Sequence, residues 1–279
     1  MKLMRRSVTV VLAVLSLMAA IAPPSASAAS SKHDGEFFYL CEFSHRSKDD
    51  PIAYPRQPRA SHRSDFYGNT RTNAYSTAKK LAAGSTTCRV LDDKSAYYYP
   101  TLMRRGAIQR PWKVHIYYRN QATGAPRAFP FGFKYVAGNP KATSAQHGWR
   151  QRYFWQCGDT VANTHHATPP DCPNDTLTLM IRFPQCWDGV RKDSWNHHAH
   201  MVYPRKGTCP KRYPVLLPQL QVHVQWNIHN GASGPRLYLS SGSIYGIHSE
   251  FFDAWKTTRL NALIDTCIDV GVSCHPNDL

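Results

Sequence analysis

The sequence predicts a mainly β protein: a single sandwich or jelly-roll-like domain with long disulfide-bridged loops and one C-terminal helix. Several segments alternate apolar and polar residues with the period of two that is typical of strands. The 279 residues include 20 prolines and 16 glycines, which interrupt helices and favour turns. Only one late segment has apolar residues at helical spacing, so a strand-rich fold fits better than a helical one.

The strand candidates lie along most of the chain. Residues 53–68 are rich in proline, which predicts loop with short extended pieces. Residues 95–118 consist of two β-rich runs around a turn near Gly106. Residues 177–183, LTLMIRF, are a further strand candidate. In LLPQLQVHVQW, residues 216–226, leucine and valine side chains face one way and glutamines with His223 the other, which predicts one core face and one solvent face.

The C-terminal segment is the one predicted helix. Ser249 can cap its start, and Glu250 and Asp253 would place negative charge in the first turn, where the helix dipole favours it. Large apolar side chains and one cysteine then recur at roughly helical spacing, at Phe252, Trp255, Leu263 and Cys267.

The first residues have the pattern of a signal peptide. A basic start, MKLMRR, is followed by the apolar run SVTVVLAVLSLMAAIA and the small-residue segment SASAAS, with cleavage expected after Ala28. The apolar run is shorter than the roughly 20 residues of a spanning helix, so we expect no transmembrane anchor. We therefore expect a secreted, extracellular protein with a signal peptide at 1–28, an N-terminal lead-in at 29–40 and a single globular domain at 41–279.

All eight cysteines follow this leader. An even number in an exported chain predicts disulfides, and no C-x-x-C pair suggests a zinc ribbon or a redox motif. Eight cysteines allow many connectivities, among which we expect sequential pairing. The predicted bridges are Cys41–Cys88, Cys157–Cys172, Cys186–Cys209 and Cys267–Cys274.

The chain is strongly basic. Thirty-four lysines and arginines face 18 acidic residues, and loss of Lys2, Arg5 and Arg6 with the leader lowers the formal charge from +16 to +13. Such a field attracts anionic polymers. We expect an acidic or neutral polysaccharide or a cell-wall polymer as partner, and no specific nucleic acid.

The stretch DSWNHHAHMVY, residues 193–203, packs three histidines into four positions. Together with ASHRSDFYGN at 60–69, FPFGFKYVAGNP at 129–140 and HSEFFDAW at 248–255, it resembles a large family of secreted bacterial and fungal proteins known only as domain of unknown function nineteen ninety-six. The likeness runs from about Phe43 to Cys274. The family name carries no activity, so the resemblance leaves the function open.

The resemblance implies which polar residues recur. The three blocks resemble S-H-x-H-D-F-F-G, D-S-x-D-H-x-S-H-M and H-x-D-F-F-N-A-W. Ser64 stands where the family usually has a second histidine, and Asn196 and Glu250 each replace an aspartate, which would weaken a metal centre or inactivate this member. The positions that match are His62, Asp65, Asp193, His197, His200 and His248.

Three roles are open for these residues. Imidazole suits zinc, copper and iron, so a divalent transition metal would be held by His62, Asp193, His197, His200 and His248. Without a metal, a histidine oriented by an aspartate transfers protons at neutral pH, and a polysaccharide hydrolase or lyase would use His62, Asp65, His200 and His248. The third role is a structural histidine–aspartate network. The H-E-x-x-H, G-x-S-x-G and P-loop motifs are absent from the sequence.

The alternative function is a non-catalytic carbohydrate- or cell-wall-binding module. Its stacking surfaces would come from Trp112, Trp149, Trp155, Trp187 and Tyr97–Tyr99, whereas an enzyme would contact its substrate through Trp187, Tyr203 and Trp155. The adjacent acids Asp49–Asp50 and Asp92–Asp93 are expected on exposed turns. An enzyme or metal site requires the imidazoles of His62, His200 and His248 to lie within about 5–8 Å of one another in an open cleft.

Overall fold

The computed structural model describes residues 35–160, 164–229 and 237–276. The expected signal peptide, residues 1–28, lies outside the described residues. Residues 36–40, expected in the lead-in, instead form most of strand β1 (Glu36–Cys41) in the largest sheet. That expectation is wrong because the side chains of Phe37 and Tyr39 pack in the main core.

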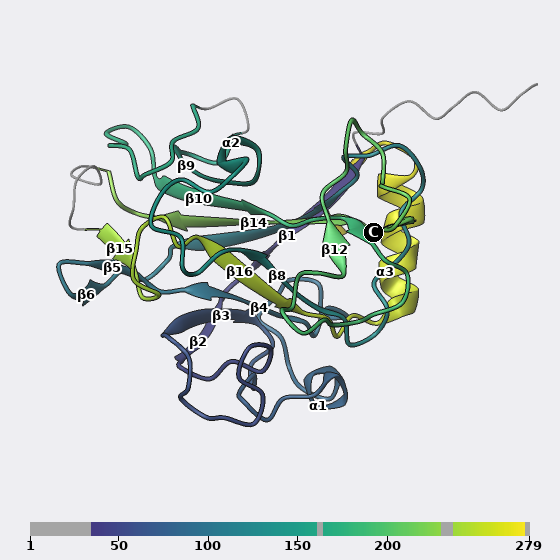
Figure 1. Ribbon diagram of the computed structural model, residues 1–279, viewed down its shortest axis with the longest axis horizontal. Coiled ribbons are helices and arrows are strands. Elements are labelled where there is room, and N and C mark those ends of the chain that lie inside the picture. The colour runs from purple at the N-terminus through teal and green to yellow at the C-terminus, as the bar shows by residue number, and fades with distance from the viewer. Residues whose placement is uncertain (1–34, 161–163, 230–236, 277–279) are drawn as a thin grey trace, which may run out of the picture.

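Two large sheets pack face to face, which confirms the predicted mainly β fold (Figure 1). Neighbouring strands in both sheets are antiparallel, except that β17 and β1 are parallel. The six-stranded sheet has the order β17 (Ser273–Cys274), β1, β7 (Lys113–Arg119), β14 (Gln219–Trp226), β10 (Leu177–Arg182) and β9 (Tyr153–Cys157). The five-stranded sheet has the order β2 (Phe43–Ser47), β3 (Ser64–Gly68), β4 (Ala96–Pro100), β16 (His248–Phe252) and β8 (Lys134–Gly138).

Smaller elements surround the sandwich. Two three-stranded sheets comprise β12 (Met201–Val202), β11 (Cys186–Trp187) and β13 (Val215–Leu216), and β15 (Leu237–Leu239), β5 (Leu102–Arg104) and β6 (Ala107–Ile108). The helices are α1 (Ala78–Ala82), α2 (Trp149–Arg152) and α3 (Thr257–Leu263), and α3 continues into the π-helical turn η1 (Ile264–Ile268). Within the three described ranges, no helix is long and apolar enough to span a membrane.

The two large sheets share one core. Tyr99 of β4 meets Trp226 of β14 edge to face, with ring centroids 6.2 Å apart. The hydroxyl oxygens of Tyr97 and Tyr118 are 2.6 Å apart, and the Tyr97 hydroxyl also donates to the buried carboxylate of Asp93 at 2.7 Å. Tyr97–Tyr99 are therefore not a stacking surface and Asp93 is not on an exposed turn. Both expectations are wrong because these polar groups satisfy one another inside the core.

The predicted strands are present, but one predicted solvent face is not. Residues 95–118 contain β4, β5, β6 and all of β7 except Arg119, residues 177–183 contain β10, and residues 216–226 contain the second of the two residues of β13 and all of β14. The expected wet face of β14 is buried, and Asp159, which follows β9, lies 2.7 Å from Nδ1 of His223 on that face.

The C-terminal helix exists but begins later than predicted. Residues 248–252 form β16, which pairs with β4 on one side and β8 on the other. Backbone hydrogen bonds from two neighbours outweigh the local capping signal at Ser249. Glu250 consequently projects from a strand face instead of a first helical turn.

All four disulfides form in the predicted sequential order. None of the described cysteines is free. The bridges are Cys41–Cys88, Cys157–Cys172, Cys186–Cys209 and Cys267–Cys274.

Candidate functional site

The candidate site lies on the outer face of the five-stranded sheet. Side chains alternate along β16, so Phe251 enters the main core while Phe252 packs in a second, smaller apolar cluster with Phe66 and Tyr98. The same alternation places His248 and Glu250 on the outer face with Phe252. The long connection between β2 and β3 covers this face and supplies Ile52 to its apolar cluster.

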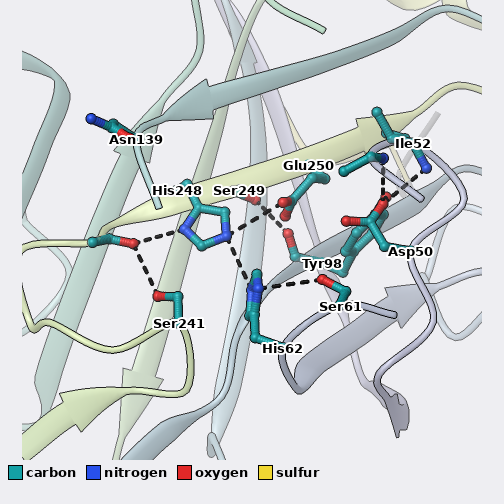
Figure 2. A network of polar contacts seen from close by, with 12 residues as sticks. Asp50, Ile52, Ser61, His62, Tyr98, Asn139, Ser241, His248, Ser249 and Glu250 are labelled. Carbon is teal, nitrogen blue, oxygen red and sulfur yellow. Dashed lines mark hydrogen bonds and ion pairs between the residues drawn. The ribbon is translucent and has the colours of Figure 1, made fainter. Parts of the chain in front are cut away.

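His62 of that connection meets His248 of β16. Their Nε2 atoms are 3.1 Å apart, although 186 positions separate them in the chain (Figure 2). Nδ1 of His248 lies 2.7 Å from the carbonyl oxygen of Gly246, which can only accept, so Nδ1 carries the proton. A neutral His248 therefore offers an Nε2 lone pair, and the Nε2–H of His62 donates to it.

Two buried carboxyl groups lie behind the imidazole pair. Oε1 of Glu250 is 3.4 Å from Nε2 of His248, and its buried Oε2 has no hydrogen-bond partner among the described residues. Asp50 anchors the loop through Oδ1, which accepts from the backbone of Ile52 and Ala53, each at 2.9 Å, and from the Tyr98 hydroxyl at 2.8 Å. Asp50, expected on an exposed turn, is thus buried as the anchor of this loop.

Burial favours the neutral forms of the imidazoles and of Glu250. Burial and then the neighbouring His62 lower the pKa of His248 to about 3. Burial also lowers the pKa of His62, with Asp50 opposing the shift. The pKa of Glu250 is raised well above its ordinary value by burial and then by the charge of Asp50. At neutral pH the cluster therefore contains two neutral imidazoles beside a carboxyl group whose neutral form is favoured by burial.

The histidine-rich segment 193–201 borders this face along strand β8. The backbone N–H of Val136 donates to the carbonyl of His197 at 2.9 Å. Within the segment, Nδ1 of His197 lies 2.8 Å from Asp193, and Nδ1 of His200 lies 2.9 Å from the Ser194 hydroxyl. These local hydrogen bonds fix the loop and occupy one ring nitrogen of His197 and one of His200.

His200 is buried apart from the imidazole pair. Its ring packs against Phe133, with centroids 5.1 Å apart. Burial lowers the pKa of His200, while Asp193 and the backbone of Lys134 partly oppose this shift. Of the three histidines expected to converge, the structure brings His62 and His248 together and gives His200 other partners.

Asp65 is engaged elsewhere. Both of its carboxylate oxygens pair with Arg46 on the neighbouring strand, at 2.5 and 2.9 Å, and Oδ1 also accepts from the Thr101 hydroxyl at 2.7 Å. The side chain is fully buried. Asp65 therefore stabilises the sheet and pairs with Arg46, whereas it was expected to serve the histidine cluster as a catalytic acid.

A groove of about 600 Å³ lies along strand β8, and His62 and His248 are not among its lining residues. It reaches the outer face at Val136 and Gly138, which are the register partners of Glu250 and His248 on the adjacent strand, and directly opposed residues share a face. Lys141 and Arg152 line it, and no acidic residue of the described ranges does. This groove therefore favours anionic ligands.

The predicted substrate-contact residues separate into three groups. Tyr203 lines the groove and carries the Arg152 guanidinium 3.9 Å from its ring centroid. Trp187 is half-buried against Phe133 and donates to the carbonyl of Arg191 at 2.7 Å. Trp155 has no exposed surface, so its predicted contact with substrate is wrong, because β9 turns it into the core. The Trp149 side chain lies outside what the structure describes.

For a metal ion, the structure provides two facing nitrogen donors, those of His62 and His248, but no third ligand atom close to both among the described residues. Across the described residues, the only His, Cys, Asp or Glu group with three ligand atoms within 4.8 Å of one another is Cys41, Cys88 and Asp93. Its two cysteines are joined in a disulfide and cannot coordinate as thiolates. His62 and His248 could hold an ion only if another ligand moved toward them.

Lys134 is a site residue that sequence reasoning missed. It projects from β8 and its ammonium donates to the carbonyl of Pro51 at 3.4 Å. Burial lowers the pKa of Lys134, and the charges of Asp193 and Asp50 oppose this shift. The amine therefore lies between the β2–β3 connection, which carries Asp50, and the 193–201 loop, which carries Asp193. No local signal marks it, because its role depends on pairing between distant segments.

A comparison with known families identifies the family of this chain. The family model described as Domain of unknown function (DUF1996) matches residues 50–255, a range that begins at Asp50 and includes both imidazoles. The chain belongs to this family. No curated protein and no solved structure matches it.

Proposed function

We propose that this DUF1996 protein is a secreted polysaccharide lyase that cleaves an acidic polysaccharide by acid–base catalysis. The four disulfides and the signal-peptide pattern support export. The contact between His62 and His248 carries the chemical part of the proposal.

His62 is the proton-transfer group. Its Nε2–H is held by the lone pair of His248, which leaves Nδ1 to accept a proton. Only a weak contact of 3.3 Å to the Ser61 hydroxyl occupies that atom. Because its pKa is lowered, His62 is uncharged at neutral pH and can act as a base. The imidazolium that forms is stabilised by His248 and by the nearby charge of Asp50.

The basic groove would hold the substrate. Lys141 and Arg152 can neutralise uronate carboxylates, and Tyr203 offers an aromatic wall beside them. Neutralising the carboxylate makes the adjacent C5–H of a uronic acid more acidic. A basic groove next to a neutral base is the combination that β-elimination needs.

The reaction balances without a co-reactant. His62 takes the C5 proton, the electron pair forms a C4=C5 double bond, and the bond from C4 to the glycosidic oxygen breaks. His62 then returns its proton to the leaving oxygen. Hydrolysis by paired carboxylates is less favoured, because Asp50 is buried and its Oδ1 already accepts three hydrogen bonds.

The test is a product screen with His62→Ala. Wild type incubated with polygalacturonate, alginate and hyaluronate should release unsaturated products from at least one polymer, detected by the ultraviolet absorbance of the new double bond. His62→Ala should lose about 10²- to 10⁴-fold in rate. His275→Ala, which removes an exposed imidazole elsewhere, is the matched control.

Two outcomes would contradict the proposal. New reducing ends without ultraviolet absorbance would indicate a hydrolase. Binding of the polymers without any cleavage would favour the carbohydrate-binding module, with the imidazole cluster as a loop-fixing network.

A further inference from the structure

A second groove, of about 440 Å³, lies where the two large sheets meet at β1, β2, β3 and β7. It shares no lining residue with the groove beside His248. Phe43 and Tyr67 form part of its wall, and Arg89, Arg110, Trp112 and Lys113 line it as well. The Cys41–Cys88 disulfide joins β1 to the segment that carries Arg89, so this wall is fixed covalently.

Three cations in this groove lack acidic partners. Arg89, Arg110 and Lys113 make no ion pair with any described residue, whereas nearby Arg46 is neutralised by Asp65. Glu42 is the single acidic residue in the lining. Unpaired guanidinium groups match planar carboxylates, which they can bind with two parallel hydrogen bonds.

An exposed indole lies beside these cations. Trp112 is 57% exposed, whereas Trp155, Trp226 and Trp255 are almost completely buried. The Lys113 ammonium is 3.9 Å from the Trp112 ring centroid, and the Arg110 guanidinium lies 5.1 Å from that of Phe43. Exposed aromatic surface of this kind gains from covering the apolar face of a sugar ring, and the cations reach its acidic substituent.

We infer that this groove is an accessory binding site for uronic acid residues of an acidic polysaccharide. One carboxylate is bound by Arg89 and Arg110, and the sugar ring packs on Trp112. The inference takes its ligand class from the proposed function, but the site is distinct from the imidazole pair. It would keep the protein on a long polymer while a distant segment occupies the catalytic groove, which raises the local substrate concentration.

The test is calorimetric titration of trigalacturonate into His62→Ala protein, which removes turnover. Adding Trp112→Ala or Arg110→Gln to this background should remove one bound trimer per chain, or weaken its affinity at least tenfold. Trp195→Ala, which removes an indole that is 86% exposed elsewhere, and Arg212→Gln, which removes an exposed charge, should bind like the background protein.

The outcomes separate this inference from the proposed function. A single site that is lost in Trp112→Ala supports the accessory site even if no polymer is cleaved. Unchanged titrations in both groove variants overturn it. Stronger binding of oligothymidylate than of trigalacturonate, with the same dependence on Trp112, also overturns it and indicates a single-stranded nucleic acid site.

Discussion

The buried imidazole of His248 should make the protein sensitive to acid. Its pKa of about 3 in the folded protein lies below the ordinary 6.5 of an unfolded histidine. The stabilisation by the neutral ring is therefore fully present above pH 6.5 and is lost as the pH falls toward 3. Between pH 7 and pH 4 the imidazole of His248 becomes protonated in the unfolded protein but stays neutral in the folded protein. This difference lowers the free energy of unfolding by about 3 kcal/mol.

The measurement compares wild type with His248→Gln. Urea unfolding followed by tryptophan fluorescence at pH 7 and pH 4 gives the loss of stability for each protein. The variant has no imidazole to titrate, so its loss should be smaller than that of wild type by about 3 kcal/mol. The exposed-site control His275→Gln should lose as much as wild type. Equal losses in wild type and His248→Gln would refute the reasoning, because His248 would then titrate alike in the folded and unfolded protein.

Two further predictions concern the neighbours of this ring. Burial raises the pKa of Glu250, so the folded state loses stability as the pH rises above the pKa of this carboxyl group in the unfolded chain. Glu250→Gln should therefore be more stable than wild type at pH 8 and should lose that advantage near pH 4. Thermal melting at both pH values measures this difference. His200→Ala removes a buried ring and its hydrogen bond to Ser194, which should lower the free energy of unfolding by about 2–4 kcal/mol. The rate of polymer cleavage should change less than threefold. A rate loss as large as that of His62→Ala would instead give His200 a catalytic role.

Local sequence signals predicted the covalent and periodic features. Disulfide formation and strands such as LTLMIRF at β10 follow from residue type and spacing, whereas the sequential pairing of the cysteines was an expectation that the structure confirms. The histidine-rich stretch was also informative, because its residues do border the site. The sequence of this stretch did not reveal its chemistry, because His197 and His200 form hydrogen bonds within their own loop.

The partnerships within the site came only from the tertiary structure. Asp65 is three positions from His62 in sequence, but the pairing of β2 with β3 places it opposite Arg46, with which it forms an ion pair. His62 lies near Asp50 instead. Residues 248–252 carried a helix-capping signal that pairing on both strand edges overrode.

The amino-acid sequence by itself therefore determined the β class, the presence of disulfides, the basic charge and the family of this protein. The tertiary structure decided which polar groups meet. Periodicity and capping are local properties, whereas the contact between His62 and His248 depends on backbone hydrogen bonds that align strands far apart in the chain. Burial, which sets the protonation of that pair, likewise exists only once both sheets and the β2–β3 connection are packed together.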